Sequence, residues 1–468
     1  MITVSKSDGF DNAILEICEP FFKRFKINKI LRRFYAVKQK GVSVYAAFLF
    51  LSGLVFSGKN LYGVIKTEPE RIDFEKDVVY RLLGDSRIYW EQILAHTAYA
   101  VIAELKQAAR VGITKEAAQT RYLEANVVDD TPIYRNRSKK VELLSRFFDH
   151  STNRYYKGFD LLGLGWTDGQ TYIPVMAQMV ASGNNENLLE DSHIKEDRRT
   201  LATRRRVNAR KDKNTLTLQM LQAINGTPAQ SQYVLFDSWF ESPLSLTSIK
   251  NIGYDVVARA KNNENYRYLY KGEMRSISRI YQMNKKRRGK SRYLLSVDIH
   301  VRHEDFDGEV DAKLVFVRDR ANRKKWICFV STDVSLTETE ILDLYELRWK
   351  IEGFFKVIKT FLHIETEFQT RSFDAITAHA SIVMIRYIIL ALKNREAGDG
   401  STVHGVFFAL CHVLDSITFK NLFSEISGTI IAGLIEIFHA VPDKVTSFFE
   451  FFMANLPDNI KGRLVLSI

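Results

Sequence analysis

The sequence has few cysteines and no long apolar run. Its three cysteines, Cys18, Cys328 and Cys411, are odd in number and far apart, and no Cys/His spacing is typical of a zinc site. This pattern excludes a disulfide framework and favours a reducing compartment. The apolar runs are too short to cross a bilayer, since Arg386 interrupts the longest, 381–392, and the first residues lack the apolar core of a signal peptide. We therefore expect a soluble intracellular protein with no membrane partner.

Internal repeats and low-complexity segments are also missing. With 46% apolar and 26% charged residues, the composition is that of a globular protein and excludes extensive disorder. A chain of 468 residues is too long for one compact core. It should therefore form two to four domains, or one domain with large insertions.

The positive charge is concentrated in two stretches. Nine basic and three acidic residues lie between Lys195 and Lys213, and Asn284–Arg292 (NKKRRGKSR) has six basic residues and no acid. Together these stretches carry the whole net charge of +12. Either one alone is typical of a solvated loop, but the pair favours binding to a polyanion such as nucleic acid.

The pattern of apolar residues changes along the chain from helical to strand-like and back. It predicts an α/β core between helical ends, with a β-rich insertion in the core. A hairpin turn is expected at 167–170, and Thr337 with Glu340 forms a capping box that begins a helix reaching about His363. The expected regions are helical 1–120, core 121–261, β-rich insertion 262–334, core 335–371 and helical 372–468.

Acidic side chains end two apolar strands. Asp129 and Asp130 follow one strand, and Asp237 follows another in the segment VLFDSWF. A carboxylate in such surroundings is costly to desolvate unless it is paired or binds a cation. The alternative is that each aspartate caps the next turn or helix, as aspartate often does.

A third carboxylate comes from an apolar helix. At about 100° per residue, Tyr345, Arg348, Glu352, Lys356 and Lys359 fall within an arc of about 80°, directly beside the apolar face. An i, i+4 ion pair would explain Arg348 and Glu352 but not the other three. The position beside the core indicates a functional surface at the rim of a sheet.

Two aspartates at strand ends and one glutamate on a helix provide oxygen ligands suited to Mg²⁺ or Mn²⁺. Two such ions about 3.5–4 Å apart can serve phosphodiester chemistry. Cationic side chains beside them would hold phosphates, and the tyrosine could donate a hydrogen bond or stack. The order strand, strand, helix is what a ribonuclease-H-like nuclease or strand transferase needs.

The spacing Tyr345-x2-Arg348-x3-Glu352-x6-Lys359, with VVDDT and VLFDSWF upstream, resembles the Tyr-Arg-Glu-Lys signature of the DDE transposases of the insertion-sequence-four family. The resemblance covers about 126–359. It implies a ribonuclease-H-like α/β fold, two Mg²⁺ ions for which Mn²⁺ can substitute, and transposon-end DNA as substrate. Cleavage of one strand by water and attack by the freed 3′-hydroxyl, on the opposite strand or on target DNA, would use one site.

Carried over residue by residue, the resemblance implies catalytic and metal-binding roles for Asp130, Asp237 and Glu352. Asp130 is selected because it precedes a threonine, although the neighbouring Asp129 remains an alternative. The implied DNA-binding residues are Tyr345, Arg348, Lys356 and Lys359, which would contact phosphates, and Trp326, which would stack on a flipped base unless it is a core residue of a strand.

The resemblance also implies partners and a location. The N-terminal helices would recognise terminal inverted repeats, and the C-terminal helices would support a homodimer in a synaptic complex, in a bacterial cytoplasm at the nucleoid. Two alternatives remain: a metal-dependent DNA nuclease without transposition, and a non-catalytic DNA-binding derivative.

Overall fold

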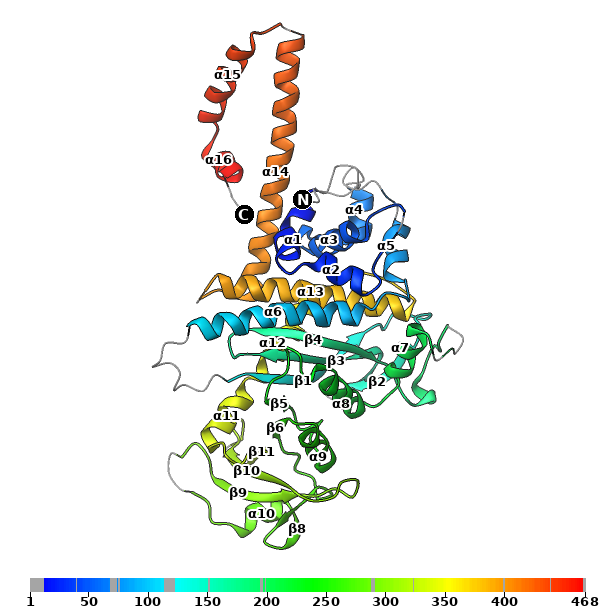
Figure 1. Cartoon of the computed structure of the whole chain (residues 1–468), viewed down its shortest axis with the longest axis vertical. Coiled ribbons are helices and arrows are strands. Elements are labelled where there is room, and N and C mark those ends of the chain that lie inside the picture. Colours follow the sequence, from blue (N-terminus) through cyan, green and yellow to red (C-terminus); the bar gives the residue numbers. More distant parts are fainter. Residues whose placement is uncertain are drawn as a thin grey trace. The chain divides into compact units, whose positions relative to one another are not determined.

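The computed structural model describes residues 12–38, 40–67, 74, 76–112, 123–149, 152–193, 197, 199–287, 291–322, 324–398, 400–437 and 439–465 (Figure 1). The chain forms two compact units, both discontinuous in sequence. One contains the segments before Arg33, Val37–Leu82 and the chain from Glu396 onward; the other contains Leu83–Arg395 with Arg33–Ala36. The fold class is mixed α/β, as predicted.

The first unit is helical. Nearly every residue of α3 is buried, and Gly53 lets this helix approach α1 closely, since a Cβ there would lie 2.3 Å from the carbonyl oxygen of Ile14. Its elements are α1 (Asn12–Arg24), α2 (Ile27–Arg33), α3 (Val44–Leu54), the 3₁₀ turn η2 (Val55–Ser57), α4 (Leu61–Thr67), α5 (Lys76–Leu83), α14 (Val403–Glu436), α15 (Pro442–Ala454) and α16 (Asp458–Val465).

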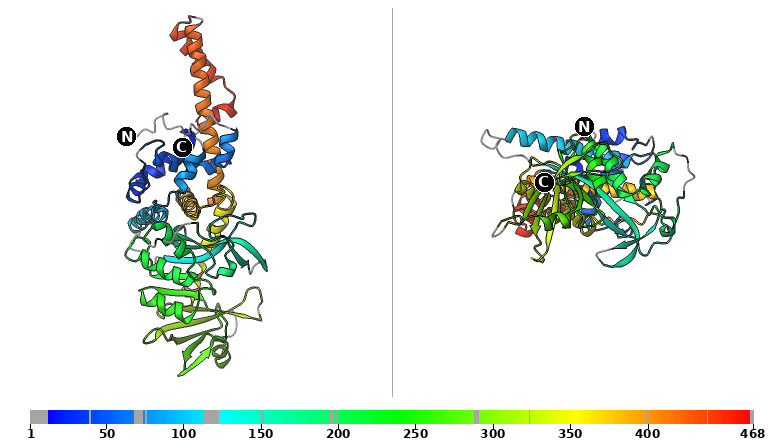
Figure 2. Two further views of the ribbon diagram at one scale, coloured as in Figure 1. Left: turned by 90° about the vertical axis from the view of Figure 1, so that its right-hand side faces the viewer. Right: turned by 90° about the horizontal axis from the view of Figure 1, so that it is seen from below.

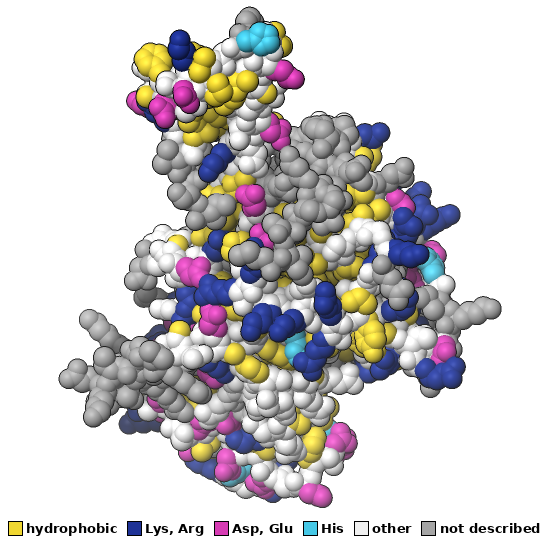
Figure 3. All heavy atoms as spheres, turned by 45° about the horizontal axis from the view of Figure 1, so that its top comes forward, with side chains coloured by type: hydrophobic (Ala, Val, Ile, Leu, Met, Phe, Trp, Pro, Cys, Tyr) yellow, Lys and Arg dark blue, Asp and Glu magenta, His cyan; other side chains and the backbone are white. Residues whose placement is uncertain are grey.

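In the part of the chain that the structure describes, two helices are long and apolar enough to cross a membrane, which corrects the expectation that no segment is. They are α13 (Phe373–Glu396), whose apolar window is entirely buried in the protein, and α14, whose window is one-third buried; the bent pair α3–η2 with α4 also meets the length criterion. Small and weakly polar residues extend the apolar run of α13 beyond 381–392. Burial explains why α13 is apolar on all sides. Apolar side chains are exposed on α14 and α15, among them Leu422, Ile426 and Phe451 (Figure 3).

The second unit contains one mixed sheet of eleven strands in the described residues. Strand β1 pairs antiparallel with β3 and parallel with β5, β3 pairs antiparallel with β4, and β5 pairs parallel with β6. Beyond β6 the sheet continues through β11, β10, β9, β7 and β8, so the β-rich insertion extends the core sheet. The strands are β1 (Ala125–Tyr134), β2 (Ser145–Asp149), β3 (Arg154–Thr167), β4 (Tyr172–Val180), β5 (Tyr233–Phe236), β6 (Asp255–Arg259), β7 (Arg267–Tyr270), β8 (Glu273–Ser276), β9 (Leu295–Val301), β10 (Val310–Arg318) and β11 (Trp326–Ser331).

Helices cover the sheet. The long helices α6 and α13 lie side by side in both views of the unit, and α6 packs against β4 (Figures 1 and 2). Both belong to the unit that carries the sheet, whereas the sequence pattern had grouped them with the helical ends. The helical segments are α6 (Trp90–Gly112), η5 (Asn185–Asn187), α7 (Leu201–Ala209), α8 (Lys213–Ile224), α9 (Pro243–Asn251), α10 (Ile277–Met283), α11 (Glu338–Glu346), α12 (Trp349–Thr360) and α13.

The predicted hairpin turn and capping box are confirmed. Gly169 has a φ of 87° in the turn between β3 and β4, and the side chain of Asp168 accepts hydrogen bonds from two backbone N–H groups there. Thr337 and Glu340 cap α11 reciprocally. Both signals depend only on residues that are close together in the chain, so the sequence alone is enough to predict them.

The prediction of one helix from Thr337 to about His363 is wrong. The chain forms α11 and α12, separated at Leu347 and Arg348. There the backbone bonds tighten to three-residue spacing: the N–H of Leu347 donates to Leu344 (3.0 Å) and that of Arg348 to Tyr345 (3.1 Å). The break leaves Arg348 at the junction of the two helices.

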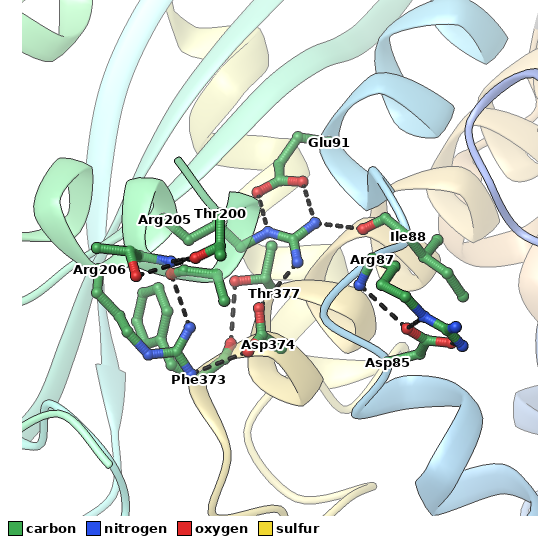
Figure 4. Close-up of polar contacts among 12 residues, drawn as sticks. Asp85, Arg87, Ile88, Glu91, Thr200, Arg205, Arg206, Phe373, Asp374 and Thr377 are labelled. Carbon is green, nitrogen blue, oxygen red and sulfur yellow. Dashed lines mark hydrogen bonds and ion pairs between the residues drawn. The ribbon is translucent and has the colours of Figure 1, made fainter. Parts of the chain in front are cut away.

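Two central arginines of the basic stretch 195–213 have a structural role, while the predicted role of the stretch in binding nucleic acid stays a prediction. Arg205 and Arg206 on α7 are buried and share Asp374 at 2.9 Å each (Figure 4). Arg205 also pairs with Glu91 (2.7 Å), and Arg206 with Glu142 (2.6 Å). Their charge is therefore neutralised inside the protein. Lys195 and Arg198 lie outside the described residues.

The second basic stretch is also partly engaged. Arg292 pairs with Asp343 (2.7 Å), and Lys286 and Arg287 lie over the rings of Tyr281 and Tyr293. Arg288 and Lys290 lie outside the described residues. The proposed role of this second basic stretch in binding a polyanion stays a prediction.

Candidate active site

The register of two parallel strands brings Asp129 and Asp237 together. Strands β1 and β5 pair Ala125 with Tyr233 and Val127 with Leu235. Asp129 and Asp237 each lie two residues beyond the last of these pairs, and they are close enough for the charge of Asp237 to raise the pKa of Asp129. In-register neighbours of parallel strands direct their side chains to the same face of the sheet. Asp237 begins the turn after β5, where its carboxylate accepts the N–H of Trp239 (2.8 Å).

Burial and repulsion make Asp129 a weak acid. Burial and, next, the charge of Asp237 raise the pKa of Asp129 to about 7, although the guanidinium of Arg348 acts to lower it. Asp129 thus lies in a poorly solvated place beside a second carboxylate, and Arg348 only partly offsets the cost of its charge. This is the environment that favours a bound cation.

Helix α12 brings Glu352 to the same face. Arg348 joins the two elements, with Nη1 3.0 Å from Oδ2 of Asp129 and Nη2 2.7 Å from Oε1 of Glu352. Arg348 is buried, whereas the side chain of Glu352 is 41% exposed and can therefore reorient. Helix α12 packs against β1, and Phe355 lies next to Gly163, the residue paired with Asp129, where an added Cβ would make ordinary contact with the ring at 3.6 Å.

Asp130, the ligand selected by the resemblance, also lies within reach of the charge of Asp237, but its other neighbours differ from those of Asp129. Successive side chains of a strand point to opposite faces, so Asp130 and Asp129 lie on opposite faces of β1. Its Oδ2 lies 2.7 Å from Nζ of Lys213, the first residue of α8, which also contacts Asp160 at 2.7 Å. Burial raises the pKa of Asp130, and the nearby Lys213 opposes this rise. The geometry thus groups Asp129, and not Asp130, with Arg348 and Glu352.

The residues expected to contact DNA differ in how deeply they are buried. Tyr345 is buried against Phe329, with ring centroids 4.6 Å apart, and beside Arg348. Lys356 is exposed on α12. Lys359 is half-buried over the ring of Tyr134 at 5.6 Å, and burial lowers its pKa. Lys356 and Lys359 are thus the more accessible cations of the signature.

Trp326 lies in an aromatic cluster of the insertion. The ring is half-buried, stacks on Tyr281 with centroids 4.9 Å apart, and meets Phe316 edge-on at 5.1 Å. It is the first residue of β11. The structure therefore gives this side chain a packing role in the strand, as the alternative interpretation expects, and its contact with a base stays a prediction.

Sequence reasoning missed a group on the Asp130 face. Asp160 lies among apolar residues of β3, and Asp237 directly follows the apolar strand β5. The same sequence signal, an acid next to an apolar run, could therefore have identified Asp160. Its carboxylate accepts a hydrogen bond from the hydroxyl of Tyr156. Lys213 also lies 4.6 Å from the ring of Trp239, which is 44% exposed beside Asp237. Pairing across strands, which the sequence does not reveal, brings these residues together.

The donor set suits a hard divalent cation, because all three candidate ligands are carboxylates. Within the described part of the chain, however, no three acidic, histidine or cysteine side chains converge closely enough to hold a metal ion. Arg348 lies between Asp129 and Glu352 instead. The three carboxylates are chemically suited to a metal ion, but two of them, Asp129 and Glu352, contact Arg348.

Comparison with known protein families identifies the class. A family model described as DDE superfamily endonuclease matches residues 56–296, which include Asp129, Asp130 and Asp237 but not Glu352. The chain belongs to this family. DDE endonucleases act on DNA and generally use divalent metal ions, so the protein is an endonuclease of this type. A comparison with curated proteins finds no match.

Proposed function

We propose that this protein is a transposase of the insertion-sequence-four type, which cleaves DNA at the ends of its element and joins those ends to target DNA. The observation that carries the proposal is the proximity of Asp129 to Asp237, together with the link from Asp129 through Arg348 to Glu352. The Tyr-Arg-Glu-Lys spacing adds the transposase family to the endonuclease class.

We infer a ribonuclease-H-like core. The support is an antiparallel set, β1, β3 and β4, continued by the parallel strands β5 and β6, with acids on β1 and directly after β5. In open sheets, sites form where the carboxyl ends of neighbouring parallel strands meet. Asp237 lies at that edge.

Asp129, Asp237 and Glu352 would hold Mg²⁺, or Mn²⁺ in its place. Bound ions would neutralise the three carboxylates and polarise the phosphodiester to be cut. The register with β5 and the contact with Arg348 support Asp129 as the first ligand in place of Asp130. Arg348 would release a carboxylate when a cation binds and then become available to a DNA phosphate.

The remaining signature residues would have different roles, either binding phosphates or positioning Arg348. Lys356 and Lys359 are accessible on α12 and would bind backbone phosphates. Tyr345 is buried and would position Arg348. Recognition of terminal repeats by the N-terminal helices, and a synaptic homodimer formed through the C-terminal helices, complete the proposal.

Two neighbouring aspartates provide a matched test. Asp129→Asn, Asp237→Asn and Glu352→Gln should each abolish Mg²⁺-dependent nicking of a duplex that carries the element end, whereas Asp130→Asn should retain measurable nicking. Wild-type nicking by Asp129→Asn would exclude Asp129 as a ligand. Wild-type nicking by Asp237→Asn would refute the site as a whole.

Products separate the transposase from its alternatives. A transposase should cut only duplexes with the inverted repeats that flank its coding region, and should join the cut ends to a second DNA. Cutting without joining would support a nuclease. DNA binding without any nicking would support a non-catalytic derivative.

A further inference from the structure

A basic cavity lies where β1 ends. Its volume is about 890 Å³, and two loops line it: residues 134–141, which follow the strand, and residues 365–371, between α12 and α13. Neither loop belongs to the carboxylate site. The pairing of these loops is invisible in the sequence, in which more than two hundred residues separate them.

The cations of this cavity are available to a ligand. Arg137, Lys139, Lys140 and Arg371 are exposed. No ion pair neutralises any of these four among the described residues, in contrast to Arg205 and Arg206. Glu365 is the acid in the described lining, and its carboxylate already accepts the backbone N–H of Tyr134 (3.0 Å).

The cavity continues the line of the candidate active site. Tyr134, the last residue of β1, lies five residues after Asp129, which corresponds to about 17 Å along an extended strand. Lys359, two helical turns beyond Glu352, covers the ring of Tyr134. Strand β1 and helix α12 thus both lead from the carboxylates to the cavity along a path of this length. At 3.4 Å per base pair, its length equals about five base pairs of DNA.

We infer that this cavity binds the phosphate backbone of the substrate DNA about five nucleotides from the bond that is cut. The inference rests on the proposed function, which makes DNA the substrate. Arginine and lysine side chains on two facing loops suit consecutive phosphates of a polymer better than one free anion. The side chains of Thr366, Gln369 and Thr370 add neutral hydrogen-bonding groups of the kind that contact DNA phosphates and sugars.

The salt dependence of binding measures these contacts. The probe is a fluorescein-labelled DNA duplex of arbitrary sequence, bound to the full-length protein in EDTA and followed by anisotropy from low to moderate salt. Because each lost phosphate contact reduces the slope of log affinity against log salt by about one, Arg137→Ala/Lys139→Ala/Lys140→Ala should reduce it by about two to three. Arg371→Ala, on the facing loop, should reduce it by about one.

A matched variant controls for net charge. Arg267, Lys271 and Arg279 are exposed on and near β7 and α10, at the other end of the sheet order. Their triple alanine variant removes the same charge and should leave the slope near that of the wild type. All substituted side chains are exposed, and the thermal unfolding midpoints of the variants should confirm that they fold.

The outcomes separate the two claims. Equal slopes for the cavity and control variants would overturn the cavity as a DNA site, while wild-type binding and nicking would leave the proposed function intact. Displacement of the duplex by millimolar inorganic phosphate would assign the cavity to a free anion and also overturn the inference. Absence of duplex binding by the wild type would refute the proposed function as well.

Discussion

The carboxyl group of Asp129 should make the metal-free protein sensitive to pH near neutrality. Its pKa in the folded chain is about 7, against 3.8 for a free aspartate. When folding raises the pKa of an acid, its contribution to stability is fully present at pH values below its pKa in the unfolded chain. This contribution is lost as the pH rises through its pKa in the folded chain. The wild type should therefore lose a few kcal/mol between about pH 4 and 7, since a tenfold change in proton affinity is worth about 1.4 kcal/mol.

Asp129→Asn removes this titration. Denaturant unfolding in EDTA should show the variant gaining on the wild type as pH rises through that window. Mg²⁺ at neutral pH should restore stability to the wild type and not to the variant, because only the wild type retains the ligand. Parallel pH profiles of the two proteins would contradict the burial of this carboxylate beside Asp237.

Lys213 forms ion pairs with two partly buried carboxylates, Asp130 and Asp160. Lys213→Met should destabilise the protein by about 3–5 kcal/mol at neutral pH, because it leaves both acids without their cation. Denaturant unfolding measures the loss. Adding Asp160→Asn to this variant should recover part of it, and a Lys213→Met protein as stable as the wild type would show that the contact carries no net stabilisation.

At this scale the sequence identifies residue types but not their partners. It places acids at two strand ends and selects Asp237 and Glu352. The choice between Asp129 and Asp130 depends on which face each side chain occupies and on the register with β5, and β5 lies about a hundred residues away along the chain. No local pattern contains that register.

Among the elements, strand β3 uses glycine to admit an aromatic ring. A Cβ at Gly165 would lie 2.2 Å from the ring of Tyr172, which packs against Phe354 of α12. Gly165→Ala should therefore cost about 1–3 kcal/mol in unfolding free energy and disturb the helix that carries Glu352. Gly163→Ala is the control, since its Cβ would make only ordinary contact at 3.6 Å. Equal unfolding free energies for the two variants would show that Tyr172 moves without cost.

Helix boundaries illustrate what sequence can and cannot predict at this scale. The capping box of α11 is a local signal and is confirmed. The break before α12 is not visible in helical periodicity, because Leu347 and Arg348 keep helical backbone angles. Arg348 at that break pairs with Asp129 on the sheet, a tertiary contact that competes with continuous helix.

Across the whole molecule, the position of charge matters more than its total. Arg205 lies in a buried network with Asp374 and Glu91, so Arg205→Gln should lower the unfolding free energy by about 3–5 kcal/mol. Its exposed neighbour Arg204 is the control, because Arg204→Gln should change stability by less than about 0.5 kcal/mol. Arg205→Gln should not alter the salt dependence of DNA binding, because its charge is already neutralised by Glu91 and Asp374, and a reduced slope would show that Arg205 contributes to a DNA footprint.

Counting charges along the chain could not predict this distribution. The stretch 195–213 has the composition of a polyanion site, yet its central arginines are neutralised by acids from α6, α13 and the segment after β1. The available cations of residues 137–140 form a shorter run that the composition does not single out. Burial, which decides between the two, is a property of the fold.

The discontinuity of the two units has a consequence for biosynthesis. Because the sheet-bearing unit ends at Arg395, all of its strands and its Glu352 helix have been translated before the segment from Glu396 is made. The helical unit, by contrast, needs α14 to pack against α1, which was translated first. On the ribosome, the sheet-bearing unit can therefore fold before α14 is available to pack against α1.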